Sequence, residues 1–139
     1  MKAVILAAGK GSRLMPLTTS VPKSLILING VPLLERMLKQ LKEVGIMDVV
    51  VVVHHLKGEI MNYCSGSPFG MNVTCVEQEE MKGTADAVLC AESHVVGRFL
   101  CIAVDSFFET SLLNELINTE GGVITCKEVE DPSRFGVLE

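Results

Sequence analysis

A glycine-rich loop with two nearby cations is the strongest chemical signal in the chain. The apolar run Lys2 to Ala8 leads into Gly9-Lys10-Gly11-Ser12-Arg13, and Pro22-Lys23 follows shortly after. Glycines at the end of a strand let backbone N–H groups approach a phosphate closely. Arg13 can hold two phosphate oxygens with its planar guanidinium, and Lys23 can place a point charge on the same anion. The pattern therefore predicts a phosphate-binding site.

Two common phosphate-binding motifs do not fit this loop. A Walker A loop would need glycine at Val4 and serine or threonine at Gly11, and the dinucleotide fingerprint would need a third glycine near Leu14. Pro16 also disfavours a helix that starts directly from the loop. A plain glycine turn with two solvated cations stays open as an alternative, although residues 1–34 contain no acidic partner for them.

The charge distribution favours a small anionic ligand. The net charge is -5 at pH 7, yet residues 1–34 carry only positive side chains, namely Lys2, Lys10, Arg13 and Lys23. A positive segment on an acidic protein suits a compact anion better than nucleic acid, which needs a broad basic surface. We therefore expect no nucleic-acid partner.

Gln78, Gly83 and Asp105 are further candidates for a ligand site. Gln78 follows an expected strand, and its amide offers the donor and acceptor that pairing with a base edge requires. Gly83 precedes a helix that Thr84 could cap, and the missing Cβ would let a flat base approach. Asp105 ends an apolar strand, where a hard carboxylate oxygen suits Mg²⁺. The alternatives are a solvated acidic loop, an ordinary helix start and a helix cap, respectively.

His54, His55 and the cysteines are expected to be structural. Adjacent residues on an extended chain point to opposite faces, so the two histidines would not converge on one metal ion. The cysteines are widely spaced and odd in number, which predicts neither a disulfide framework nor a zinc site. They are Cys64, Cys75, Cys90, Cys101 and Cys126.

Strands and helices that could position these residues alternate along the chain. Val- and Ile-rich runs predict strands at 2–8, 48–53, 72–76, 99–104 and 123–128. Helical periodicity predicts helices at 32–45, 57–63, 84–93 and 111–118. Strands that are apolar on both faces are typical of a parallel sheet covered by helices on both sides. The expected fold is therefore α/β, doubly wound, with a mostly parallel sheet.

Length and composition fit one soluble domain. The chain has 139 residues, of which 48% are hydrophobic and 21% charged, so it lies outside the range of disordered proteins. Its apolar runs are far shorter than the ~20 residues that span a bilayer, and no signal peptide is evident. We expect a cytoplasmic protein without a membrane partner. The last residues, Phe135 to Glu139, look like the start of another strand, so we expect a domain truncated at its C-terminus.

The motifs together resemble the signature of the sugar-1-phosphate nucleotidylyltransferases. The resemblance begins with Gly9-x-Gly-x-Arg-Leu-x-Pro-Leu-Thr and covers essentially the whole chain in order. Its further members are Pro22-Lys23, Pro32-Leu33-Leu34-Glu35, Gly45-Ile46, Gln78, Gly83-Thr84-Ala85-Asp86-Ala87, Asp105 and Asp131-Pro132-Ser133-Arg134-Phe135-Gly136. The resemblance implies a Rossmann-like nucleotidyltransferase fold. Residues 1–139 would form the N-terminal, nucleotide-binding portion of the catalytic domain.

The resemblance also implies a reaction and a set of site residues. A nucleotidyl group would pass from a nucleoside triphosphate to a sugar-1-phosphate, with Mg²⁺ as cofactor and Arg13, Lys23 and Asp105 as catalytic residues. Asp105 would bind the metal, and Lys23 and Gly136 would contact the sugar phosphate. The nucleotide would contact Leu6, Ala8, Gly9, Gly11, Ser12, Arg13, Gln78, Gly83 and Thr84. A homo-oligomer is compatible with this interpretation, and neither the base nor the sugar is specified.

Two departures from the family pattern bear on activity. Val104 stands where the family usually has glycine, and we expect its branched side chain to crowd the nucleotide or to restrict the backbone. A second metal-binding aspartate and the sugar-reading residues of the family would lie beyond Glu139. The alternative hypotheses are a nucleotide-binding half-domain or regulatory relative that binds a triphosphate without catalysis, and a purely structural role.

Overall fold

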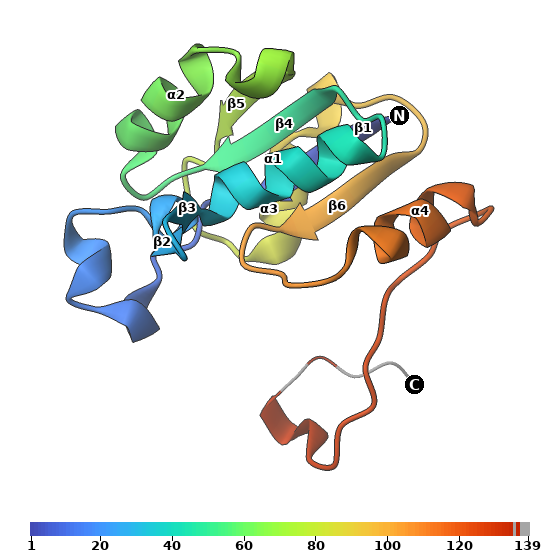
Figure 1. Cartoon of the computed structure of the whole chain (residues 1–139). Helices are drawn as coiled ribbons and strands as arrows, with labels where there is room; N and C mark the ends of the chain where they lie inside the picture. The colour runs from blue at the N-terminus through green and yellow to red at the C-terminus, as the bar shows by residue number, and fades with distance from the viewer. Residues whose placement is uncertain (135, 137–139) are drawn as a thin grey trace.

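A four-stranded parallel sheet forms the centre of the protein. The computed structural model describes residues 1–134 and 136. The strands β1 (Lys2–Leu6), β4 (Asp48–Val53), β5 (Asn72–Glu77) and β6 (Phe99–Ala103) lie in the order β5-β4-β1-β6 (Figure 1). All residues of β4 after Asp48 are buried, as a run of valines covered on both faces requires. The expected parallel sheet is confirmed.

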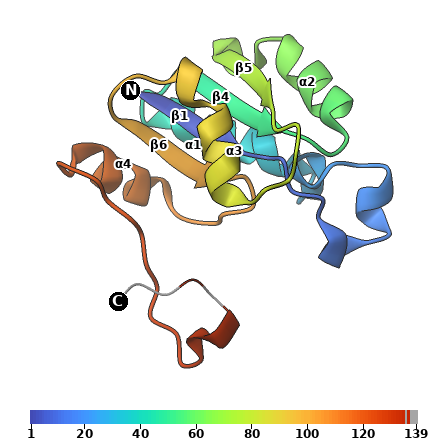
Figure 2. The same cartoon turned by 180° about the vertical axis from the view of Figure 1, so that it is seen from behind.

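Helices cover both faces of the sheet. Helices α1 (Leu33–Glu43), α2 (Lys57–Ser65) and α4 (Thr110–Asn118) contribute to the larger hydrophobic core, whereas α3 (Thr84–Cys90) packs against the other face (Figures 1 and 2). The apolar positions of α1 recur at helical spacing and are all buried; they are Leu33, Leu34, Met37, Leu38 and Leu41. The doubly wound α/β class expected from the sequence is therefore confirmed.

The strand order places a topological switch between β1 and β6. The chain runs from β1 to β4 to β5, then returns across the sheet through α3 to β6 on the other side of β1. In doubly wound sheets, ligands bind beyond the carboxyl ends of the strands at such a switch. The glycine loop follows β1 and Asp105 follows β6, so both candidate segments emerge at this point.

Short elements link the main ones. The strands β2 (Leu27–Ile28) and β3 (Val31–Pro32) form an antiparallel hairpin, and Asn29-Gly30 makes its turn with φ values of 52° and 78°. Single-turn 3-10 helices lie at Ser12–Leu14, Leu17–Thr19, Lys23–Leu25, Pro68–Gly70, Glu92–His94 and Pro132–Arg134. The first three build the excursion between β1 and the hairpin.

The strand expected at 123–128 is not formed. This segment has no regular structure and runs away from the sheet after α4, with Val123 44% and Ile124 69% exposed (Figure 1). A strand needs a hydrogen-bonded neighbour, and in the described part of the chain this segment pairs with none. The further strand expected at Phe135–Glu139 lies outside the described residues except for Gly136. No described helix has the length and apolar character that crossing a membrane requires.

Candidate functional site

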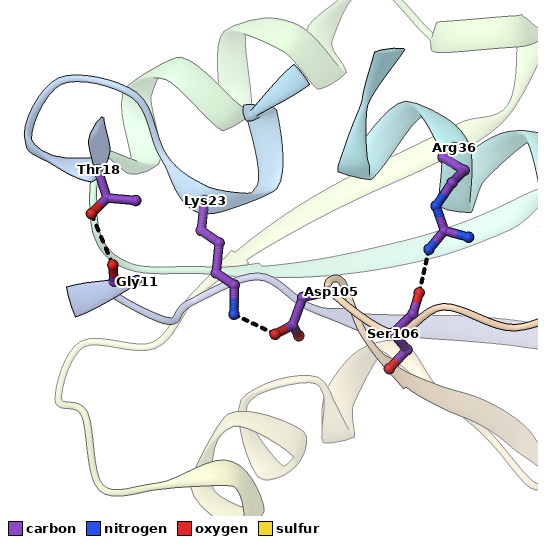
Figure 3. Close-up of polar contacts among 6 residues, drawn as sticks. All are labelled: Gly11, Thr18, Lys23, Arg36, Asp105 and Ser106. Atoms are coloured by element: carbon purple, nitrogen blue, oxygen red, sulfur yellow. Dashed lines mark hydrogen bonds and ion pairs between the residues drawn. The ribbon is translucent and has the colours of Figure 1, made fainter. Parts of the chain in front are cut away.

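The glycine loop is closed by Thr18. Gly11 has φ +64°, and its carbonyl accepts a hydrogen bond of 2.9 Å from Thr18 Oγ1 (Figure 3). A Cβ on Gly11 would lie 2.8 Å from Thr18 Cγ2 and 3.2 Å from Lys23 Cβ, so only glycine fits without displacing its neighbours. Thr18 is completely buried, whereas Arg13, in the next turn, is exposed. The packing thus fixes the loop and leaves its arginine accessible.

His54 and His55 support two different parts of the site. His54 Nδ1 donates to the carbonyl of Gln78 at 2.7 Å, and His55 Nε2 donates to the carbonyl of Thr18 at 3.1 Å. The side chains diverge because adjacent residues beyond β4 point in opposite directions. Each histidine thus supports a backbone carbonyl, in agreement with a structural role.

Lys23 and Asp105 form an ion pair across the switch. Lys23 begins a 3-10 turn, Asp105 lies in the turn after β6, and the ammonium contacts Asp105 Oδ2 (Figure 3). Burial alone would raise the pKa of Asp105, but the hydrogen bond and positive charge of Lys23 outweigh it and lower the pKa. The carboxylate is therefore ionised at neutral pH, as cation binding requires. The alternative of a helix cap is not observed, because α4 begins only at Thr110 after Glu109.

Helix α1 holds the segment that carries Asp105. Arg36 donates to the carbonyl of Ser106 (Figure 3). Its guanidinium also lies 4.1 Å from the ring centroid of Phe107. Gln40 Nε2 donates to the carbonyl of Phe108 at 2.9 Å. These contacts fix the backbone just after Asp105 against a rigid helix.

A cavity of about 280 Å³ opens beside the glycine loop, between α3 and the ends of β1 and β6. Six residues predicted to bind nucleotide line it together with three others: Leu6, Ala8, Gly9, Gln78, Gly83 and Thr84, with Met81, Ala87 and Ala103. A larger hollow of about 830 Å³ lies along β6 and α4, but no predicted site residue lines it. The smaller cavity is therefore the candidate site.

Gln78 and Gly83 are linked at one end of this cavity. Gln78 is only 3% exposed, and its Nε2 donates to the carbonyl of Gly83 at 3.1 Å and to Asp86 Oδ2 at 2.7 Å. Burial excludes the alternative of a solvated loop for Gln78. Thr84, which the sequence suggested as a cap, is instead the first residue of α3, and Gly83 is its N-cap without a side-chain hydrogen bond.

The remaining predicted residues, Lys23 and Asp105 among them, do not line the cavity. Gly11, Ser12 and Arg13 continue the loop from Gly9 but do not line the cavity. Gly136 lies in the C-terminal segment, exposed and with nothing within 4 Å of an added Cβ. The structure therefore does not bring Gly136 together with the other candidates.

Asp105 suits a magnesium ion as a single protein ligand. Within residues 1–134 and 136, no group of three His, Cys, Asp or Glu side chains gathers as a metal site. Mg²⁺ commonly takes one or two carboxylates and completes its shell with water and substrate phosphates. The pairing of Asp105 with the Lys23 ammonium shows that this carboxylate already attracts a cation.

Val104 does not crowd the cavity, contrary to the expectation from the sequence. Its side chain is 4% exposed and belongs to the core cluster that contains Ile102 and Leu113. Side chains alternate along an extended chain, so Ala103 faces the cavity and Val104 faces the opposite side of the sheet.

The substitution Val104→Gly should therefore destabilise the protein without tightening nucleotide binding. Loss of a buried valine side chain should lower the free energy of unfolding by roughly 1.5 to 3 kcal/mol. Urea unfolding and nucleotide titration of the same variant would measure both effects. Tighter binding by the variant would show that Val104 does obstruct the site.

Comparison with known proteins shows the family to which the chain belongs. A family model described as nucleotidyl transferase matches residues 2–139. The chain belongs to the nucleotidyl transferase family. The relatives of the chain confirm the resemblance to sugar-1-phosphate nucleotidylyltransferases that its motifs indicated.

Curated relatives in the nucleotidyl transferase family match this chain over most of its length. Bifunctional protein GlmU from Methanococcus aeolicus is 38% identical over 138 residues, which are 99% of this chain and 33% of that protein. UTP--glucose-1-phosphate uridylyltransferase AglF from Haloferax volcanii is 38% identical over 112 residues, covering 81% of this chain and 46% of that protein. The chain thus spans between a third and a half of the length of these relatives.

Solved structures of the family share the fold. The inositol-1-phosphate CTP transferase from T. maritima has a TM-score of 0.73 and 26% identity, covering 83% of this chain and 47% of its own. A UDP-glucose pyrophosphorylase complexed with UDP-glucose has a TM-score of 0.71 and 25% identity, covering 83% and 51%. The Rossmann-like nucleotidyltransferase fold is therefore shown for this chain.

The sequence motifs did not reveal the roles of Thr18 and Asp86. Both occur in the motif strings, but neither received a role. Thr18 closes the glycine loop, and Asp86 holds the Gln78 amide. Asp86 lies in the first turn of the expected helix, 8 residues after Gln78, and this spacing was the available signal for its contact with the Gln78 amide.

Proposed function

We propose that the chain is the nucleotide-binding part of a sugar-1-phosphate nucleotidylyltransferase, with residues 1–139 as the N-terminal portion of its catalytic domain. The reaction transfers a nucleotidyl group from a nucleoside triphosphate to a sugar-1-phosphate and releases pyrophosphate. The names of the relatives support this reaction class. The cytoplasmic location expected from the sequence stays a prediction.

One observation carries the proposal. Six residues predicted to bind nucleotide line a single cavity, although they come from two segments that lie far apart in the chain, 6–9 and 78–84. The cavity lies at the switch between β1 and β6, and the segments that leave these strands carry the glycine loop and Asp105. A base held in the cavity against Gln78 and Gly83 would have its phosphates directed along the glycine loop toward Arg13 and Lys23.

The chemistry requires positioning and charge neutralisation. An anionic oxygen of the sugar-1-phosphate attacks the α-phosphorus, a new P–O bond forms, and the bond to the β-phosphate breaks as pyrophosphate leaves with the electron pair. No general base is needed because the attacking oxygen is already anionic. Arg13 and Lys23 counter the repulsion between the two phosphate substrates, the main electrostatic obstacle.

Asp105 is the residue that would hold Mg²⁺. When bound, the ion neutralises phosphate charge and orients the phosphate oxygens. Lys23 pairs with Asp105 in the structure. With both substrates bound, Asp105 would hold the cation and Lys23 would contact phosphate. The ion pair therefore keeps both side chains at the site before substrate binds.

Arg13→Ala should weaken triphosphate binding by roughly 1.5 to 3 kcal/mol, the range for one charge-assisted contact. Lys57→Ala is the matched control, because Lys57 is also cationic and its exposed pair with Glu77 at 2.5 Å is outside the cavity. Calorimetric titration of both variants with a nucleoside triphosphate would measure the difference. Equal losses, or none, would remove Arg13 from the site.

A further inference from the structure

The Gln78 side chain at the end of the cavity is oriented by its neighbours. Both hydrogens of its Nε2 point at acceptors, the Gly83 carbonyl at 3.1 Å and Asp86 Oδ2 at 2.7 Å. The Gly83 carbonyl also accepts the amide N–H of Ala87 at 3.2 Å. The amino end of Gln78 is thus fully used inside the protein.

The hydrogen-bond partners determine the orientation of the Gln78 side-chain amide. A carbonyl oxygen accepts only, and so does an ionised carboxylate, so a reversed amide would set Gln78 Oε1 against two acceptors. Such a reversal would lose two hydrogen bonds at a residue that is only 3% exposed. The orientation therefore follows from the partners and not from the amide's shape alone.

The Oε1 atom remains for a ligand. No described residue donates a hydrogen bond to it, and among the described residues the fully buried side-chain atoms without a partner are Ser24 Oγ and Arg36 Nε, not this one. Gln78 lines the candidate cavity, whereas Asp86 lies behind it and lines a different hollow with Glu79, Glu80 and Lys82.

We infer that Asp86 is a positioning residue for base selection, which locks the Gln78 amide so that its carbonyl oxygen faces the cavity. The ligand chemistry that fits is a nucleobase that donates an N–H to this oxygen. Asp86 acts through Gln78 and does not touch the nucleotide itself. The inference rests on the proposed function, since it assigns the cavity to the base of a nucleoside triphosphate.

The lock has a direct readout that needs no nucleotide. In the full chain labelled with ¹⁵N, the Gln78 side-chain NH₂ protons should exchange slowly with solvent because both are hydrogen bonded inside the protein. Asp86→Ala should speed this exchange about tenfold, the effect of losing one hydrogen bond to a charged group. Asp86→Asn should keep most of the protection, because its Oδ1 can still accept. Glu79→Ala is the charge control, because the Glu79 side chain is exposed and is not one of the two hydrogen-bond acceptors of the Gln78 amide.

The second readout is base selectivity. Titrations with UTP, CTP, GTP and ATP would give the ratio between the tightest and the weakest ligand. Asp86→Ala should lower this ratio about tenfold because the freed amide can turn and offer its amino group. Inorganic triphosphate should bind the parent and all three variants equally.

The outcomes distinguish the role of Asp86 in orienting Gln78 from the proposed nucleotide-binding function. Unchanged NH₂ exchange in Asp86→Ala would overturn the lock whatever the protein binds. Faster exchange with an unchanged base ratio would limit Asp86 to a structural role and overturn the selection. Failure of the parent to bind any of the four nucleotides would overturn the proposed function, and with it base selection, while the exchange data still report on the lock.

Discussion

Replacing Asp105 by asparagine should abolish the gain in triphosphate affinity that Mg²⁺ provides, a loss of about 3 kcal/mol or near 150-fold. Asparagine has nearly the same shape but lacks the charge that holds the cation. Without Mg²⁺, Asp105→Asn should instead raise the affinity for triphosphate. Lys23 is then released from its partner, and a negative charge near the phosphates disappears. Calorimetry with and without the metal measures both arms.

Asp48→Asn provides the matched control for this experiment. Asp48 lies at the opposite end of the sheet, at the start of β4, and accepts a hydrogen bond of 3.1 Å from Asn72 Nδ2. Its replacement should leave the Mg²⁺ dependence unchanged. The fold should also survive in Asp105→Asn, because the ion pair that it breaks is partly exposed and such pairs stabilise little. A metal effect that persists in Asp105→Asn would remove this residue from the metal site.

Gly11→Ala should destabilise the protein by about 2 to 5 kcal/mol. The left-handed backbone accounts for about 1 to 2 kcal/mol of this, and the contact of the new Cβ with Thr18 and Lys23 for about 1 to 3 kcal/mol. Triphosphate affinity should fall as well, since the loop must move to relieve the contact. Urea unfolding and titration measure the two effects.

Two further variants separate the causes. Gly30 has φ +78° and nothing within 4 Å of an added Cβ, so Gly30→Ala should show the backbone strain alone. Thr18→Ser keeps the hydroxyl that bonds Gly11 but removes the methyl group in the way, so adding it to Gly11→Ala should restore part of the stability. Equal losses in Gly11→Ala and Gly30→Ala would show that loop packing is unimportant.

Local patterns predicted the main elements well. The buried run of β4 and the apolar stripe of α1 each follow from residue types within a few positions. The divergence of His54 and His55 also follows from chain geometry alone. Alternation from Leu100 and Ile102 to Val104 carried the information that Val104 faces the core, and only the comparison with the family pattern suggested crowding.

Contacts between distant segments were beyond the sequence. The pairing of Lys23 with Asp105 depends on β6 lying next to β1, which strand order decides and local propensity does not. Conversely, the Val- and Ile-containing segment at 123–128 has strand propensity but no strand beside it, so tertiary context overrides it. The fully buried Thr18 received no role because its partner is a backbone carbonyl that folding brings close.

The central claim is that this chain binds a nucleotide through its phosphates, with the positive residues of segment 1–34 facing the phosphate tail. Calorimetry in Mg²⁺ with matched nucleoside, monophosphate and triphosphate series of the common bases tests it most directly. The triphosphate of the preferred base should bind about 100-fold more tightly than its monophosphate, as one or two additional charge-assisted contacts would give. Equal affinity for nucleoside, monophosphate and triphosphate would contradict the account.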